Sequence, residues 1–329
     1  MALRPVRLEP LFVPRIWGSR NLAPLFPKKN SLTQPIGEAW LTGNECRFAD
    51  GPFAGQKLGD VWPKMSEEWA GKRAKHKESF PVLVKFLFPE DKLSVQVHPD
   101  DDYAKRYEGT SGGTGKTEMW YVVSARPGAE VRVGLKPEVN KEGFRRAIDE
   151  GYAEEMLETI PVNAGDAIFV PAGAVHTIGP GMVLCEVQQN SDLTYRVYDF
   201  NRRDAQGKSR ELHIEKAFHV IRFGKQLGGK LPLSREQYRS EGTSVLVDCR
   251  YFCAVKESFS NEQYAAKRDG RLKISIISEG SGFLEAGTDG ERVAYERGQA
   301  WIIPAAAPEC IFEPKERTTL LTVTTPEQV

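Results

Sequence analysis

A short pattern that occurs twice constrains the fold of this chain more than any other feature of the sequence. GDAIFVPA at residues 165–172 aligns with GQAWIIPA at 298–305, and the similar segments 119–128 and 273–282 precede them in the same order. The interval between the two segments is longer in the first copy, by about the length of a helical pattern at 140–157. Self-similarity of this kind predicts a repeated unit with a helical insertion in its first copy. The alternative is a chance likeness between strands bounded by Gly and Pro.

Runs of alternating apolar and polar residues, separated by Gly and Pro, predict a mainly β chain. The expected strands are at residues 81–88, 93–98, 118–124, 129–135, 166–172, 182–189, 194–200, 244–260, 272–280 and 299–305. Apolar residues at helical spacing predict helices at 58–76, 140–157 and 211–223. Each copy therefore suits a small antiparallel barrel or jelly roll. We predict two tandem jelly-roll barrels, with inserted helices in and around the first.

The charge composition excludes several classes of partner. The chain has 45 Lys and Arg against 45 Asp and Glu, so no net charge attracts nucleic acid or an anionic membrane surface. The amino terminus lacks the apolar core of a signal peptide, and no apolar run approaches the roughly 20 residues that cross a bilayer. The five cysteines form no CxxC motif and are expected to be reduced. We therefore expect a soluble cytoplasmic protein without nucleic-acid or membrane partners.

Two of the five histidines lie in the most strongly patterned parts of the first copy. Gln96 and His98 are two residues apart in a predicted strand, so their side chains project from the same face. His176 follows a Gly and Pro corner, and Glu118 begins a strand between the two motifs. Imidazoles, a carboxylate and an amide oxygen suit a borderline divalent ion such as zinc. We therefore predict a metal site at Gln96, His98, Glu118 and His176.

Each of these residues also has an ordinary structural interpretation. His98 could be a hydrogen-bonded core histidine, Glu118 a surface charge and His176 a turn residue. The second copy has Glu309 at the position that matches His176, and no histidine follows His219. The second barrel is therefore expected to lack the metal site and to be a structural or dimerising domain.

The boundary between the two domains is expected in segment 225–242, which is polar and rich in Gly. We therefore predict a catalytic, metal-binding domain at 1–235 and a second, degenerate domain without a metal site at 236–329.

The run that ends at His176 resembles the second conserved motif of the cupin superfamily, except that Pro180 replaces the usual Asn. In the first motif, Gln96 stands where a histidine is usual, and an inserted loop delays the glutamate to Glu118. With these departures, the sequence resembles the zinc-dependent type I mannose-6-phosphate isomerases. The segments that resemble that family, especially its short bacterial branch, are 17–18, 36–40, Lys85, 93–100, 116–120, 171–177, 190–200 and 277–282.

The resemblance implies a reversible conversion of the phosphosugar mannose 6-phosphate into fructose 6-phosphate through an enediol. It also implies that Gln96, His98, Glu118 and His176 bind one zinc ion per chain, which would act as a Lewis acid beside O1 or O2 of the sugar.

The same resemblance assigns Arg196 to the active site. Its guanidinium could stabilise the enediol charge or hold the phosphate, and its structural alternative is an ion pair with Asp192 or Asp199. Lys116 is the second expected catalytic residue, because it is two residues from Glu118 and could share its face. Lys85 and Ser94 are expected to bind substrate, since they supply donors for a phosphate or for hydroxyl groups.

Several points stay open at this level. The proton-transfer base could be a lysine near the metal, Glu118 or Glu186, and Glu186 could instead be an ordinary strand carboxylate. Rival functions are an isomerase or epimerase of another phosphosugar, a metal-binding sugar-phosphate sensor without turnover, and a metal-free interaction module. The Gly-rich loop 100–117 is flexible enough to act as a lid.

Overall fold

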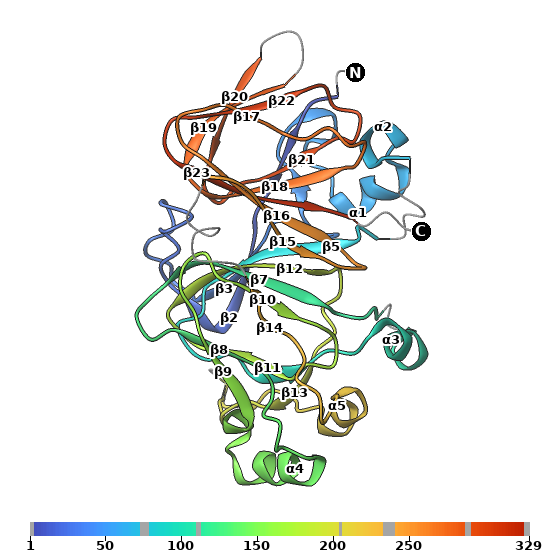
Figure 1. Cartoon of the computed structure of the whole chain (residues 1–329), viewed down its shortest axis with the longest axis vertical. Helices are drawn as coiled ribbons and strands as arrows, with labels where there is room; N and C mark the ends of the chain where they lie inside the picture. The colour runs from blue at the N-terminus through green and yellow to red at the C-terminus, as the bar shows by residue number, and fades with distance from the viewer. Residues whose placement is uncertain are drawn as a thin grey trace.

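The computed structural model describes residues 3–72, 79–109, 113–203, 206–232, 241–286 and 291–325. Its strands form four antiparallel sheets, which follow one another along the long axis of the molecule (Figure 1). Two sheets form each of two jelly-roll barrels, so the predicted fold class is confirmed.

The first barrel consists of sheets I and II. The strands of sheet I are β2 (Leu11–Ser19), β3 (Ile36–Trp40), β5 (Val82–Leu87), β7 (Glu118–Ala125), β10 (Ala167–Val170), β12 (Met182–Gln189) and β14 (Gly229–Lys230). Those of sheet II are β6 (Val95–Val97), β8 (Glu130–Leu135), β9 (Leu157–Pro161), β11 (His176–Ile178) and β13 (Tyr195–Tyr198). Sheet I has the order β14-β10-β7-β12-β5-β3-β2, and sheet II the order β13-β6-β11-β8-β9.

The second barrel consists of sheets III and IV. The strands of sheet III are β1 (Val6–Glu9), β4 (Arg47–Phe48), β15 (Gly242–Asp248), β16 (Cys253–Phe259), β18 (Lys273–Glu279), β21 (Ala300–Ile303) and β23 (Thr318–Thr324). Those of sheet IV are β17 (Tyr264–Ala265), β19 (Ser281–Ala286), β20 (Arg292–Glu296) and β22 (Cys310–Pro314). Sheet III has the order β15-β16-β23-β18-β21-β1-β4, and sheet IV the order β17-β22-β19-β20.

The strand order confirms the predicted repeat. The series β10-β7-β12-β5 in sheet I corresponds to β21-β18-β23-β16 in sheet III, and β6-β11-β8-β9 corresponds to β17-β22-β19-β20. The two motifs that revealed the repeat are β10 and β21, which pair with the equivalent strands β7 and β18. The first copy carries helix α4 (Lys141–Glu150) between β8 and β9, at the predicted insertion.

The amino-terminal strand crosses from the first barrel to the second. In β1, Val6 lies opposite Ile302 of β21, while Leu8 lies opposite Phe48 of β4. The domain boundary between residues 235 and 236 stays a prediction. It assigns β1 to the first domain, although β1 pairs with β21 in the second barrel. Pairing between strands so distant in the chain has no local signal in the sequence.

Hydrophobic clusters fill the spaces between the sheets. Sheets I and III pack against each other through a cluster that includes Met119 from the first and Ile274 from the second. The interior of the second barrel is filled by large side chains, among them Trp301, Tyr295 and Phe312. The interior of the first barrel has an apolar cluster of its own, and the polar residues described below lie beside it.

The helices agree only in part with the predictions. The expected helices at 140–157 and 211–223 correspond to α4 and α5 (Ile214–Val220), which lie beyond sheet II at one end of the molecule (Figure 1). The expected helix at 58–76 is instead two single turns, α1 (Leu58–Val61) and α2 (Glu67–Ala70). Pro63 lacks the amide hydrogen of a continuous helix, and residues 73–78 lie outside the described part. Single 3-10 turns are at Gly51–Phe53, Trp62–Lys64 and Ala153–Met156.

Helix α3 (Asp101–Tyr107) lies in the first part of loop 100–117, for which the sequence predicts flexibility and no helix. Its first turn is capped by Asp100, whose side chain accepts a hydrogen bond from the Tyr103 amide at 2.9 Å. An aspartate at this position satisfies an otherwise unpaired amide of the first turn. Within the described residues, no helix has the length and apolar character needed to span a membrane.

Candidate metal centre

Strand pairing in sheet II brings three of the predicted residues into one row. Strand β6 lies between β11 and β13, and Gln96 lies opposite His176 on one side and opposite Arg196 on the other. Directly opposed residues project from the same face of a sheet. His98 follows the end of β6 and joins this face, as its two-residue spacing from Gln96 predicts.

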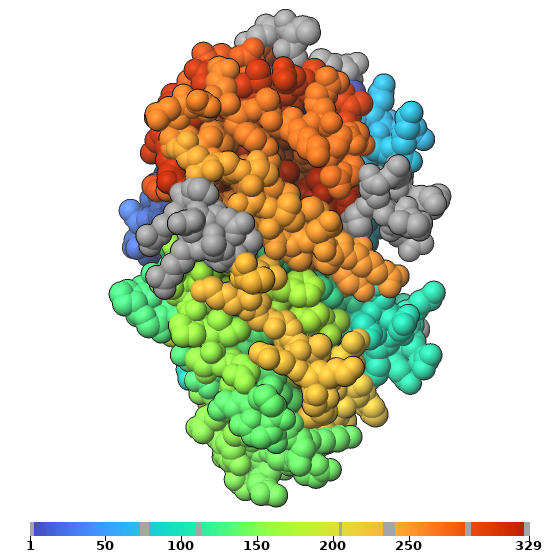
Figure 2. Space-filling view, viewed as in Figure 1, coloured from blue at the N-terminus to red at the C-terminus, as the bar shows by residue number. Residues whose placement is uncertain are grey.

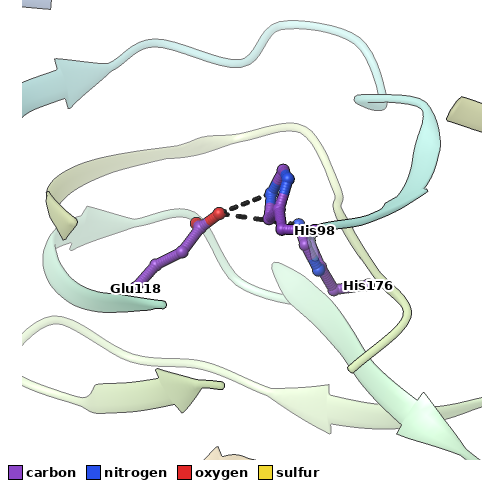
Figure 3. A group of neighbouring side chains, drawn as sticks. All are labelled: His98, Glu118 and His176. Carbon is purple, nitrogen blue, oxygen red and sulfur yellow. Dashed lines mark ion pairs between the residues drawn. The ribbon is translucent and has the colours of Figure 1, made fainter. Parts of the chain in front are cut away.

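Glu118 approaches this row from sheet I, where it begins β7 (Figure 3). Its Oε1 atom lies 2.6 Å from His98 Nε2 and 3.9 Å from His176 Nε2. The donor atoms of these three residues all lie within 4.8 Å of one another, and each side chain is only 1% exposed. Gln96 lies beside this group, with its Nε2 at 3.2 Å from His176 Nε2, while its Oε1, the atom predicted to bind the metal, accepts a hydrogen bond from Ser94 Oγ at 3.2 Å. The structure therefore brings together all four residues predicted as metal ligands.

The two histidines are held in the form that binds a metal ion. Nδ1 of His98 lies 2.9 Å from the Leu193 carbonyl oxygen, and Nδ1 of His176 lies 3.0 Å from that of Ala174. When Nδ1 donates its hydrogen to a carbonyl, Nε2 keeps a free lone pair. Burial lowers the pKa of both imidazoles, and that of His98 to about 3 with the help of the nearby Lys116. Both rings are therefore neutral, and the donor set fits a divalent ion.

Lys116 and Trp120 hold the carboxylate of Glu118 between them. The ammonium of Lys116 lies 2.8 Å from Glu118 Oε1 and 3.2 Å from His98 Nε2. The indole nitrogen of Trp120 donates to Glu118 Oε2 at 2.8 Å and to Glu186 Oε2 at 3.1 Å. Although burial alone would raise it, the ammonium of Lys116 holds the pKa of Glu118 well below its usual range. Lys116 thus lies beside the metal ligands, as its spacing predicts.

A second buried row crosses sheet I beside Glu118. Trp120 of β7 lies opposite Glu186 of β12, which lies opposite Lys85 of β5. The Lys85 ammonium is 3.0 Å from Glu186 Oε1 and 4.0 Å from Glu38 Oε1. Burial, together with the charge of Glu118, raises the pKa of Glu186 to about 7. Glu186 is therefore part of the buried polar site.

Sequence reasoning missed the outer end of this row. Arg15 donates from Nε and Nη2 to the two oxygens of Glu38, at 3.2 and 3.1 Å. Trp40 Nε1 donates to Glu38 Oε2 at 2.7 Å, which is the arrangement that Trp120 makes with Glu118. A shared signal was present in the sequence, because a glutamate precedes a tryptophan by two residues in both places.

Arg196 is half-buried beside Gln96. Its Nε atom donates to Ser94 Oγ at 3.1 Å, and Nη1 donates to the Glu211 carbonyl oxygen at 3.0 Å. Ser94 Oγ in turn donates to Gln96 Oε1 at 3.2 Å. The carboxylate of Asp199, one expected partner of Arg196, is instead bound by other arginines of the same region. The guanidinium of Arg196 therefore lies at the edge of the predicted metal ligands, and Ser94 connects it to Gln96.

The matching region of the second barrel has a different chemistry. Glu309, which aligns with His176, is exposed. Trp301, Tyr295 and Phe312 occupy the interior in place of polar groups. Among the residues that the structure describes, the cluster of three His, Cys, Asp or Glu side chains that could hold a metal ion is His98, Glu118 and His176 of the first barrel.

Two tandem jelly rolls with a buried cluster of His, Glu and Gln define a cupin protein with a candidate metal centre. Residues 6–118 match the family described as phosphomannose isomerase type I, catalytic domain. The mannose-6-phosphate isomerase ManA of Bacillus subtilis is 34% identical over 92% of this chain and 94% of its own length. That of Streptococcus mutans is 36% identical over 90% of this chain and 92% of its own length.

The solved structures agree with these sequence relatives. The crystal structure of the mannose 6-phosphate isomerase from Bacillus subtilis superposes with a TM-score of 0.82, at 30% identity, over 97% of this chain and 99% of that chain. The chain belongs to the type I mannose-6-phosphate isomerase family. The predicted family is thereby confirmed, and the roles predicted for single residues stay predictions.

Proposed function

We propose that this chain interconverts mannose 6-phosphate and fructose 6-phosphate, with one zinc ion bound by Gln96, His98, Glu118 and His176. The observation that carries the proposal is the convergence of two neutral imidazoles and an ionised carboxylate on one buried point. Nitrogen and oxygen donors of this kind suit zinc, and three or four protein ligands leave room for substrate. The family of the chain supports the same substrate pair.

When bound, zinc supplies Lewis-acid polarisation of the sugar oxygens at C1 and C2. The isomerisation moves a proton from C2 of the open-chain aldose to C1 and the hydroxyl proton from O2 to O1, through an enediol with developing oxyanion charge. Arg196 is our candidate for a fixed cation that stabilises this charge, because a half-buried donor held in place by Ser94 and the Glu211 carbonyl needs little rearrangement during the reaction. The remaining step is the proton transfer itself.

Lys116 and Glu186 are the two residues best placed to move that proton. The Lys116 ammonium lies 4.0 Å from Glu186 Oε1, so a proton on one can reach the other with a small movement. Glu186 has a pKa near neutrality because it is buried beside Glu118, which suits a group that alternates between acid and base. Oε1 of Glu118 lies 2.6 Å from the unprotonated Nε2 of His98 and 2.8 Å from the Lys116 ammonium, so we assign Glu118 to the metal and not to the proton.

The predicted phosphate ligands divide into two kinds. Ser94 and Arg196 lie together at the edge of the cluster, and we keep them as candidates for the phosphate or the sugar hydroxyls. Lys85 is 4% exposed and lies between Glu186 and Glu38. We therefore assign Lys85 to the support of those two carboxylates, since an ammonium between two carboxylates is already neutralised.

The test is an NMR assay of mannose 6-phosphate in deuterated water, with the protein as isolated, after chelation, and after zinc is restored. We expect fructose 6-phosphate to appear, to stop forming on chelation, and to return with zinc. Conversion that survives complete removal of the metal would contradict the role of the cluster. Bound metal without conversion would contradict the substrate, and a panel of other phosphosugars would then separate a related isomerase from a sensor.

A further inference from the structure

The second barrel contacts the segment that leads into the metal centre of the first. Strands β15 and β16 are joined by a turn that contains Tyr251, and the hydroxyl of Tyr251 is hydrogen-bonded to the side chain of Asp101 in helix α3. Figure 2 shows the tip of this hairpin, in orange, against the teal surface of the α3 region. A residue of the second barrel thus binds the loop between β6 and β7.

Asp101 is the point at which this loop is fastened. Its Oδ1 atom accepts a hydrogen bond from the Gly115 amide at 3.0 Å and another from Gln189 Nε2 at 2.9 Å. Gln189, at the end of β12, also accepts from the Thr117 amide at 2.9 Å through its side-chain oxygen. The carboxylate therefore joins Tyr251 of the second barrel to two backbone positions of the loop.

Those two backbone positions flank Lys116. Gly115 and Thr117 are held through Asp101 and Gln189, while the Lys116 amide donates to the Pro99 carbonyl oxygen at 3.0 Å. With its backbone fixed on both sides, Lys116 directs its ammonium to Glu118 at 2.8 Å. Loosening Asp101 would thus free the backbone from which Lys116 and the start of β7 project.

We propose that Tyr251 is a positioning residue, which the second barrel contributes to the metal centre by holding Asp101 and, through it, Lys116. A displacement of about 1 Å at a reacting group lowers rates substantially, so a hydrogen bond remote from the substrate can matter. The kinetic part of this inference rests on the proposed isomerase function. Its structural part, the fastening of the loop, does not.

The protonation state of Tyr251 supports this role. Burial raises the pKa of the phenol to about 12, and the neighbouring Asp101 contributes to the rise. Tyr251 therefore stays protonated throughout the neutral range and donates to Asp101, whose other two partners are also donors. A carboxylate with three donors suits an anchor that must stay in place.

The test compares Tyr251→Phe, which removes the hydroxyl and keeps the ring, with Tyr264→Phe as a matched control. The hydroxyl of Tyr264 donates to Glu257 within the second barrel, so both variants lose one hydrogen bond from tyrosine to a carboxylate. Amide hydrogen exchange of residues 113–118 and the separate values of kcat and KM are measured for both, together with zinc content.

We expect faster exchange at Gly115 and Thr117 in Tyr251→Phe, a kcat lowered roughly fivefold, and unchanged zinc content. Tyr264→Phe should show neither change. Adding Asp101→Asn to Tyr251→Phe should lower kcat by less than the product of the two single effects, because both act through one contact. Wild-type exchange and kcat in Tyr251→Phe, or multiplicative effects in the double variant, would overturn the proposal. If wild-type protein fails to isomerise mannose 6-phosphate, the proposed function fails, and the exchange data still decide the fastening of the loop.

Discussion

Replacement of Trp120 by Phe tests whether the indole sets the geometry of the metal ligands. Trp120 is fully buried, and its single N–H donates to both Glu118 and Glu186. Phe keeps most of the ring and removes this donor. A hydrogen bond to a charged group contributes about 1.5 to 3 kcal/mol, and about 1.4 kcal/mol corresponds to a tenfold change in affinity. Because Glu118 loses the group that orients it, we expect the Kd for zinc to rise about 10- to 100-fold.

The control is Trp301→Phe in the second barrel. Trp301 is 2% exposed and donates from its indole nitrogen to Gln299 Oε1 at 3.2 Å. Both variants lose a similar volume of buried ring, and we expect each to lower the free energy of unfolding by about 1 to 3 kcal/mol. Only Trp120→Phe should lose zinc affinity, measured by competition with a chelator of known affinity. Wild-type affinity in Trp120→Phe, or an equal loss in Trp301→Phe, would refute the idea that the indole orients Glu118.

Three further predictions concern other parts of the molecule. Arg196→Ala is expected to lower kcat by about 100- to 1,000-fold with wild-type zinc content, and a fully active variant would remove Arg196 from the catalytic residues. Burial raises the pKa of Glu257 above its ordinary 4.5, so the folded state binds a proton that the unfolded chain has released. As the pH falls from the raised pKa of the folded state toward the ordinary 4.5, this group makes the wild type more stable, and denaturation of Glu257→Gln should show a weaker dependence on pH. Burial also raises the pKa of the Cys46 thiol to about 12 and raises that of Cys185, so neither should react with a thiol reagent until the protein unfolds.

The sequence predicts contacts within one strand better than contacts between strands. Lys116 and Glu118 are two residues apart, and the expectation that they share a face is confirmed by their separation of 2.8 Å. Lys85 and Glu186 meet only because β5 pairs with β12 in a particular register. That register depends on the packing of the whole sheet, so the sequence alone could predict Lys85 only as a ligand of phosphate or hydroxyl groups and Glu186 only as one of several candidate bases.

The same limit applies to helices and to single side chains. The repeat was visible because Gly and Pro bound the same short strand in both copies. Helix α3 was missed because its three consecutive aspartates and the glycines that follow are typical of a loop. One of those aspartates caps the helix, and another fastens the segment that contains Lys116. Their roles depend on partners that lie elsewhere in the chain.

The crossing of β1 affects how the protein is made. During synthesis, β1 leaves the ribosome long before its partner β21. Val6 and Leu8 are buried in the finished protein. The nascent chain can pair Leu8 with Phe48 of β4, but the edge of β1 that pairs with β21 stays open while most of the first barrel is already available to fold. Exposed strands of this kind favour association between incomplete chains. A late step of folding therefore joins β1 to β21, and a ribosome that stalls before β21 releases a product in which this edge of β1 is uncovered.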